Sequence, residues 1–157
     1  MQELIQAGML DSYGSCMRNK PEPPDTSNGT RSRRDVKLEV AGEYPFILTA
    51  ENSDEPGYVT EKVYQGLEAG SVPIYLGAPD VDRFVPHPSS IINAADFNST
   101  ADLVAHLREL AADEARYMKH FEWKQREFTD DFKRVVALAE RTENCRLALH
   151  LEGLPME

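Results

Sequence analysis

The residues with the greatest potential for chemistry lie close together in the stretch ENSDEPGYVTEK, residues 51–62. Asn52 and Glu61 can hydrogen-bond the hydroxyl groups of a sugar or a ribose, and Tyr58 can hydrogen-bond a phosphate or cover a ring. Lys62 falls in the first turn of a predicted helix, where the helix dipole normally favours Asp or Glu over a cation. A lysine in this place is explained if an anion such as phosphate binds at the helix N-terminus.

The same stretch also fits an ordinary helix start with no ligand. Thr60 is a plausible N-cap, Glu61 would complement the helix dipole, and Lys62 would lie in solvent. A short Thr-Glu-Lys signal is weak, so spacing alone favours neither interpretation.

The elements around this stretch predict a βαβ unit. Residues 44–50 and 71–77 are short apolar runs that are typical of buried strands. A helix is predicted between them, from an N-cap at Thr60 to Gly70, with Val63 facing the sheet. This order predicts two parallel strands, and ligands of parallel sheets bind beyond the carboxyl ends of the strands. The loop over residues 51–60 occupies that location.

Further elements are predicted along the rest of the chain by apolar patterns and turn residues. They are a helix over 2–7 capped by Gly8, a strand over 9–14, a solvated loop over 18–35, a strand within 89–97, a helix from Ser99 that breaks near Asp113, a second helix with Tyr117, Phe121 and Trp123, and an amphipathic tail over 129–149. An α/β domain normally has a strand ahead of its first helix, so the predicted domain, residues 1–150, is expected to be partial at its N-terminus.

The composition of the chain disfavours some classes of function. The chain has 157 residues, 41% hydrophobic content and a formal net charge of −10. These values indicate one packed domain and disfavour a nucleic-acid binder, which needs a basic face. No apolar run approaches the roughly 20 residues that span a bilayer, and the N-terminus lacks the features of a signal peptide. We therefore expect no targeting or transmembrane segment in this sequence.

Cysteine, histidine and arginine give no metal or phosphate site. Cys16 and Cys145 can form one disulfide bond or none, and two cysteines are too few for a cysteine-rich zinc site. The four histidines do not have the spacing of metal ligands. A basic cluster in the 18–35 loop is more typical of a solvated loop than of a phosphate site.

Two short motifs carry weaker signals. Asp80-Val-Asp82 matches the D-x-D pattern by which one class of glycosyltransferases holds a divalent metal, although a solvated turn before a short helix is the favoured interpretation. Asn28-Gly-Thr and Asn98-Ser-Thr match the acceptor pattern of N-glycosylation, which would fit a lumenal protein.

Several ordered motifs together resemble the α-1,3/α-1,4-fucosyltransferase family. Residues 44–86, YPFILTAENSDEPGYVTEKVYQGLEAGSVPIYLGAPDVDRFVP, are similar to the family's F-x-L-x-F-E-N-S, Y-[IV]-T-E-K and A-G-[ST]-[VI]-P-[VI]-x-x-G succession. The upstream DSYGSC and the downstream FVPHPSSIINAADF, followed by a helix and a Tyr, Phe and Trp pattern, also look like the family. The similarity covers roughly residues 9–125, and such agreement is far more specific than Thr-Glu-Lys alone.

The resemblance implies a donor site for GDP-fucose. Carried over residue by residue, it places Asn52, Tyr58, Glu61 and Lys62 in contact with the donor, with Lys62 neutralising the diphosphate leaving group. Glu51 matches the Glu before Asn-Ser and is a further candidate contact. A fixed positive charge near the leaving oxygens would stabilise the transition state without a metal, so no cofactor is required. A divalent metal is not indicated.

The resemblance also implies a fold and a location. Similar enzymes are two-domain glycosyltransferases of the GT-B type, and this chain matches the C-terminal, Rossmann-like half, a parallel sheet flanked by helices. The acceptor domain and its general base have no counterpart in the sequence, so the catalytic base stays unknown. Eukaryotic family members lie on the lumenal side of the Golgi membrane through an N-terminal anchor that this sequence does not contain. Ala50 replaces the family's usual aromatic residue before Glu-Asn-Ser.

Three functions follow from these observations. The leading hypothesis is transfer of L-fucose from GDP-fucose to a glycan hydroxyl by an inverting fucosyltransferase, of which this chain is the donor-binding part. A second hypothesis is a nucleotide-sugar-binding module without activity, because the acceptor half is missing. A third is a GT-B glycosyltransferase that uses another nucleotide sugar.

Overall fold

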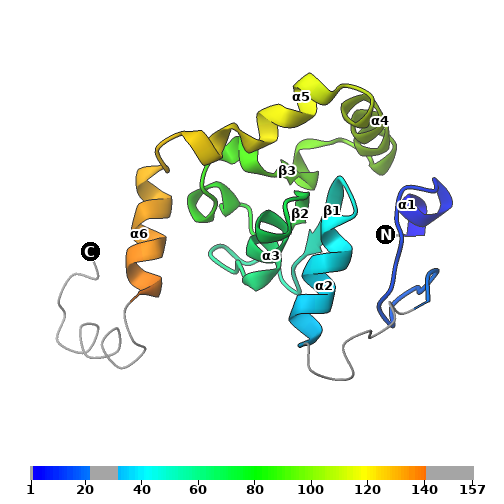
Figure 1. Cartoon of the computed structure of the whole chain (residues 1–157), viewed down its shortest axis with the longest axis horizontal. Helices are drawn as coiled ribbons and strands as arrows, with labels where there is room; N and C mark the ends of the chain where they lie inside the picture. The colour runs from blue at the N-terminus through cyan, green and yellow to red at the C-terminus, as the bar shows by residue number, and fades with distance from the viewer. Residues whose placement is uncertain (1, 22–31, 141–157) are drawn as a thin grey trace.

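The computed structural model describes residues 2–21 and 32–140, which form a small parallel sheet flanked by helices (Figure 1). The elements are, in chain order, α1 (Gln2–Gln6), α2 (Arg33–Gly42), β1 (Phe46–Ala50), α3 (Glu61–Ala69), β2 (Val72–Leu76), the 3-10 helices η1 (Val81–Phe84) and η2 (Pro88–Ser90), β3 (Ile92–Asn93), η3 (Ala94–Asp96), α4 (Thr100–Ala111), α5 (Glu114–Met118), the 3-10 helix η4 (Lys119–Gln125) and α6 (Asp130–Ala139). This arrangement confirms the predicted α/β class.

The sheet has the strand order β1-β2-β3, and both pairs are parallel. Phe46 lies opposite Val72 in the first pair, and Ile74 lies opposite Ile92 in the second. Since α3 connects β1 to its parallel neighbour β2, the predicted βαβ unit is confirmed. The strand predicted within residues 89–97 forms only as the two residues of β3.

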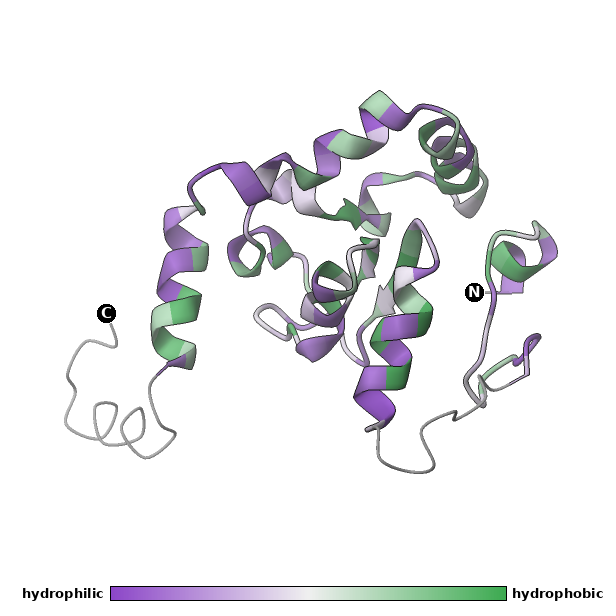
Figure 2. Cartoon of the chain, in the orientation of Figure 1, coloured by the Kyte–Doolittle hydropathy of each residue, from purple (hydrophilic) through white to green (hydrophobic). Residues whose placement is uncertain are grey.

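Side chains of β2 alternate between two packed layers, as the pleat of a strand requires. Val72 and Ile74 join Ile92 and the leucines of α4 in one core cluster, whereas Tyr75 packs with Val63 of α3 in another. Figure 1 shows α4 and α5 over one side of the sheet and α2 and α3 together on the other. In Figure 2 the hydrophobic residues concentrate on β2 and β3, while the helices carry both hydrophobic and hydrophilic residues.

Helix α3 approaches the sheet closely because Gly66 lies at the contact. A Cβ atom at Gly66 would lie 2.9 Å from Cγ2 of Ile47 and 3.0 Å from Cγ of Pro73. Val63, one turn earlier, is fully buried, as predicted. The helix ends at Gly70, whose φ of +81° is a left-handed conformation that glycine adopts without strain.

Two predictions about the N-terminal part were wrong. Residues 9–14 form no strand: their backbone is engaged in a turn, in which the carbonyl of Ser12 accepts from the N–H groups of Asn19 and Lys20, and no ladder to another described strand is present. The loop predicted over residues 18–35 ends early, since α2 begins at Arg33 behind a capping box in which Ser32 and Asp35 hydrogen-bond each other. That helix follows a segment rich in proline and polar residues, and for this reason its start was not predicted from the sequence.

The C-terminal helices follow the prediction more closely. Helix α4 begins behind Ser99, and the break near Asp113 is present because Asp113 caps α5 with its side chain. The residues after Met118 continue as the 3-10 helix η4, and the amphipathic tail forms α6. The rest of the predicted tail lies outside the described residues. In residues 2–21 and 32–140, no helix is both long and apolar enough to cross a membrane.

Candidate functional site

The candidate residues gather at the carboxyl edge of the sheet, where β1 and β2 end side by side. The backbone N–H of Glu51 donates to the carbonyl of Leu76 at 2.8 Å, so Glu51 extends the pairing of the two strands by one residue. The chain then forms the loop over residues 52–60 and enters α3. This is the location at which parallel sheets bind ligands.

Glu51 has an enclosed carboxylate that holds the start of α3. Its side chain is 0% exposed. The carboxylate accepts a hydrogen bond from the backbone N–H of Thr60 at 2.8 Å, from the hydroxyl of Thr60 at 2.7 Å and from Nζ of Lys62 at 2.7 Å. We call these three residues, Glu51, Thr60 and Lys62, the Glu51 latch.

The latch keeps both of its charged groups ionised. Burial favours a raised pKa for the Glu51 carboxyl, but the hydrogen bonds from Lys62 and Thr60 outweigh it and hold the pKa below its usual value. The hydrogen bond to Glu51 raises the pKa of Lys62 against the opposing effect of burial, and the charge of Glu61 adds to the increase. Lys62 is therefore a firmly protonated cation, and its side chain is 26% exposed.

Gly77 makes room for Glu51. A Cβ atom at Gly77 would lie 2.7 Å from the hydroxyl of Tyr75 and 2.8 Å from both Cβ and Cγ of Glu51. Contacts below 3.0 Å would force one of these groups to move. The glycine after β2 therefore allows a carboxylate from the end of β1 to enter the space between the strands and α3.

The middle of the loop is held by groups of β2 and of the segment that follows it. The backbone N–H of Gly57 donates to Asp80 at 2.8 Å, and Gly57 has a φ of +78° that favours glycine. The buried hydroxyl of Tyr75 accepts from the N–H of Ala78 at 3.1 Å and donates to the carbonyl of Tyr58 at 3.5 Å. The loop is thus fixed from the sheet side, where Val59 also packs against the cluster of Tyr75 and Val63, while Asn52, Asp54, Glu55 and Tyr58 are exposed.

Thr60 occupies the N-cap position of α3 but does not cap it with its side chain. The hydroxyl is directed to Glu51 instead. In α2, α4, α5 and α6 the N-cap side chain accepts a hydrogen bond from the backbone of the first turn. The N–H groups of the first turn of α3 therefore have no side-chain acceptor from the N-cap, and they remain suited to an anion.

The other predicted site residues lie on the solvent side of the loop. Asn52 and Glu61 are exposed, and Tyr58 is 39% exposed. In the part of the chain that the structure describes, no hydrogen bond joins the side chains of these three residues to one another. Glu51 differs from them, because a direct contact between its enclosed carboxylate and a ligand would require the latch to open.

Sequence reasoning missed three supporting residues. Tyr75, Gly77 and Asp80 position the loop and the latch, yet none was a candidate for this role. The Asp80-Val-Asp82 motif offered a signal, but Asp80 binds Gly57 and lies 3.4 Å from Arg83, while Asp82 is exposed. Among the described residues, no cluster of three acidic, histidine or cysteine side chains is arranged to hold a metal ion.

The remaining motifs lie away from the latch or cannot be placed. Cys16 is exposed and has no disulfide partner among the described residues, and Cys145 lies outside them, so the pairing of the two stays untested. Asn98 is exposed and directly precedes the N-cap of α4, while Asn28 also lies outside the described residues. His120 is bound through Nδ1 to the carbonyl of Ser89, and burial lowers its pKa.

The sequence matches one protein family over almost its whole length. The model of the glycosyltransferase family 10 (fucosyltransferase) C-terminal region matches residues 1–155. The GDP-fucose protein O-fucosyltransferase 3 of Bos taurus is 36% identical over 141 residues, which cover 90% of this chain and 30% of the relative. The protein of the same name from Xenopus laevis is 35% identical, with the same coverage.

Solved structures agree with the fold. The crystal structure of an α1,3-fucosyltransferase with GDP-fucose matches with a TM-score of 0.66 at 22% identity, over 87% of this chain and 40% of that protein. At this identity the likeness shows the fold alone, which confirms the predicted C-terminal half of a GT-B type glycosyltransferase. The chain spans about a third of the length of the curated relatives that it matches.

Proposed function

Because the chain belongs to glycosyltransferase family 10, the fucosyltransferases, we propose that residues 51–62 bind the diphosphate of GDP-fucose. The observation that carries this proposal is the start of α3, which combines first-turn N–H groups free of a side-chain cap with a protonated lysine. It lies at the carboxyl edge of a parallel sheet, where anions bind to helix N-termini.

Each predicted site residue has a proposed role that fits its position. Lys62 provides a charge-assisted hydrogen bond to the diphosphate, and the first-turn amides of α3 provide the rest of the cradle. The exposed side chains of Asn52 and Glu61 hydrogen-bond hydroxyl groups of the nucleotide sugar. Tyr58, partly exposed, covers the sugar or a ring. Glu51 acts behind them, because it keeps Lys62 protonated and in place.

The proposed reaction is a single displacement with inversion. The bond from the anomeric carbon of fucose to the diphosphate breaks while the oxygen of the acceptor hydroxyl attacks from the opposite face, and a base takes the proton of that hydroxyl. Negative charge grows on the leaving diphosphate, so a preorganised cation and helix N-terminus stabilise the transition state more than the ground state. We assign the base to the acceptor domain that such enzymes carry.

GDP binding to the protein, measured by isothermal titration calorimetry, tests the diphosphate assignment. We expect Lys62→Met to weaken GDP binding by at least about tenfold, which equals about 1.4 kcal/mol. Lys119→Met is the matched control, since Lys119 is an exposed lysine of η4 far along the chain, and it should leave the affinity unchanged. Equal affinity for the two variants, both folded by circular dichroism, would sink the assignment.

Two observations favour further candidates. The chain covers only 30% of its relatives, which supports a donor-binding module that is inactive alone. Turnover of GDP-fucose by the isolated chain would exclude that candidate, and competition between GDP-sugars and UDP-sugars would identify any other donor.

The names of the relatives favour a protein hydroxyl over a glycan hydroxyl as acceptor. A transfer assay that offers peptide and oligosaccharide acceptors side by side would decide between the two. The Golgi-lumenal location stays a prediction.

A further inference from the structure

Leu76 is an exposed apolar side chain at the carboxyl end of the central strand. Residues 72–75 of β2 are buried, with Tyr75 0% exposed, whereas Leu76 is 52% exposed. The other large hydrophobic side chains that are exposed in the described residues lie on loops and helices, namely Met17, Tyr58, Met118, Phe128 and Val136. An exposed leucine alone is ordinary on a protein surface. At the edge where parallel sheets bind ligands, it is positioned to contact one.

Leu76 is directly connected to the Glu51 latch. Its carbonyl accepts from the backbone N–H of Glu51 at 2.8 Å. The carboxylate of Glu51 in turn accepts from Nζ of Lys62 at 2.7 Å. The backbone of Leu76 is thus two contacts away from the cation that is proposed to bind the diphosphate. Gly77, the next residue, has no side chain that could cover this end of the strand.

The side chain of Leu76 shares a face of the sheet with Ala50. Side chains alternate along a strand, and Val72 and Ile74, on the same face as Leu76, pack with the leucines of α4. Ala50 is the register partner of Leu76 on β1. Because Ala50 has only a methyl group where similar enzymes usually have an aromatic residue, Leu76 provides most of the apolar surface here. We call these two residues the Ala50–Leu76 patch.

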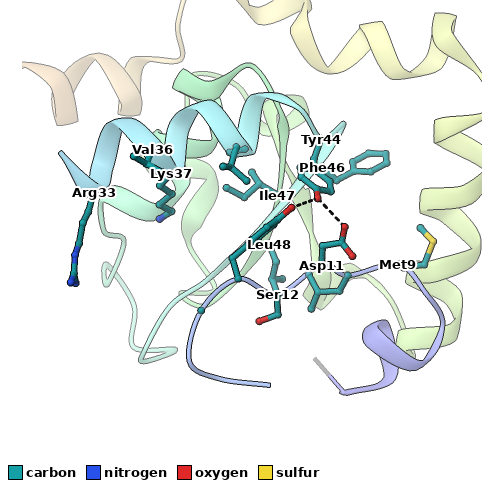
Figure 3. A pocket seen from close by; sticks show the side chains of 15 residues that line it. Met9, Asp11, Ser12, Arg33, Val36, Lys37, Tyr44, Phe46, Ile47 and Leu48 are labelled. Carbon is teal, nitrogen blue, oxygen red and sulfur yellow. Dashed lines mark hydrogen bonds between the residues drawn. The ribbon is translucent and has the colours of Figure 1, made fainter. Parts of the chain in front are cut away.

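The patch is distinct from the cavity of about 560 Å³ beside β1 (Figure 3). That cavity is lined by α2, by residues 9–14 and by β1 only as far as Leu48. Neither Ala50 nor Leu76 lines it. The patch is instead an open surface at the carboxyl edge of the sheet, next to the loop over residues 52–60.

We propose that Leu76 is a specificity-determining residue that packs against the 6-methyl group of fucose. The role rests on the proposed function, because the sugar is joined to the diphosphate that Lys62 binds. L-Fucose is a 6-deoxy sugar, so its methyl group is the most apolar part of the sugar and matches a small aliphatic surface. The guanine base is a flat ring, for which the exposed ring of Tyr58 is the better match.

A leucine in this position disfavours a hydroxyl group on C6. L-Galactose differs from L-fucose only by that hydroxyl, and packing it against Leu76 removes it from water without a hydrogen-bond partner. An enclosed apolar pocket rejects an added hydroxyl by about 100-fold. Because the Ala50–Leu76 patch is open to solvent, we expect a smaller preference for GDP-L-fucose over GDP-L-galactose, about tenfold.

Isothermal titration calorimetry with GDP, GDP-L-fucose and GDP-L-galactose tests this role. In Leu76→Asn, we expect the affinity ratio of the two GDP-sugars to fall from about tenfold to about twofold or less, with the loss seen for GDP-L-fucose and not for GDP. Leu76→Met retains an apolar side chain and should retain the ratio. Met118→Asn is the matched control, since Met118 of α5 is also 52% exposed, and it should change none of the three affinities.

Three results would each overturn the role of Leu76. They are equal affinity of the natural chain for the two GDP-sugars, an unchanged ratio in Leu76→Asn, and an equal loss for GDP and GDP-L-fucose, which would place Leu76 at the nucleoside. Lys62→Met, measured alongside, separates this failure from that of the proposed function. If Lys62→Met weakens GDP binding while Leu76→Asn leaves the ratio unchanged, the diphosphate assignment stands and only the role of Leu76 is wrong.

Discussion

The N-termini of α3 and α4 differ in how they use the hydroxyl of the N-cap residue. Both begin behind a hydroxyl residue, Thr60 or Ser99. The Ser99 hydroxyl oxygen accepts from the N–H of Asp102 at 3.1 Å and its proton goes to the carboxylate of Asp102 at 2.8 Å, so α4 caps itself. Thr60 donates to Glu51 and leaves its helix uncapped by the side chain. The N-cap hydroxyl therefore donates a hydrogen bond to whichever carboxylate the fold brings near it.

The two carboxylates also differ in origin. Asp102 lies three residues after the cap, in an exposed first turn. Glu51 lies nine residues before Thr60, comes from the end of β1 and has a side chain that is 0% exposed. A local cap stabilises a helix and closes its N-terminus. A carboxylate from a neighbouring strand fixes the helix in place and leaves the N-terminus open for a ligand.

The largest expected effect is that of Glu51→Ala. The substitution leaves the N–H and hydroxyl of Thr60 and the ammonium of Lys62 without their acceptor, at a cost of about 3 kcal/mol in the free energy of unfolding. Asp102→Ala, the matched change at α4, should cost less than about 1 kcal/mol because that carboxylate is local and exposed. Urea denaturation measures both, and equal costs would contradict the distinction between the two helix starts.

Gly77→Ala should have the next largest effect. Its new Cβ would overlap Glu51 and Tyr75, so we expect a loss of about 2 kcal/mol together with weaker GDP binding. Gly14→Ala is the control, since nothing lies within 4 Å of a Cβ atom there. If the two variants have the same stability and the same GDP affinity, Gly77 does not shape the latch.

Ser99→Ala should have a smaller and purely structural effect. Loss of the cap costs about 1 kcal/mol, measured by urea denaturation, and GDP affinity should be unchanged. Thr60→Ser retains the hydroxyl that donates to Glu51. It should therefore lower the free energy of unfolding by less than Ser99→Ala does. A fall in GDP affinity for Ser99→Ala would show that the two helix starts are not independent.

The smallest expected effect is the dependence of the latch on pH. The pKa of Glu51 is lower in the folded chain than in the unfolded chain, so its stabilisation is fully present above the unfolded value of about 4.5. It is lost as the pH falls through the folded value. The difference in unfolding free energy between the natural chain and Glu51→Gln should therefore shrink in acid, and a constant difference from neutral pH to below pH 4 would refute the assignment.

Local signals explain which parts of the fold were predictable. The strands around residues 46–50 and 72–76 are apolar runs, and the helix between them ends at a glycine, so each could be identified without its neighbours. Residues 9–14 were also predicted as a short strand but form none. A strand exists only where another backbone pairs with it, and that partner is not encoded within the segment.

Helix α2 shows the opposite error. Its capping box at Ser32 and Asp35 is a local signal that was available in the sequence, and Val36 and Val40 have helical spacing. The proline-rich polar stretch ahead of it led to the prediction of a longer loop. A capping box in the sequence can therefore identify the start of a helix even after a proline-rich stretch.

The sequence by itself determined the residue types of the site, the βαβ unit that carries it and the family of the chain. Only the tertiary structure decided that Glu51 pairs with Lys62, that Thr60 does not cap α3, and that Gly77 opens the space between them. Residue types and helical or strand periods are properties of neighbouring residues. The direction of a hydroxyl or a carboxylate depends on which strands and helices meet in space.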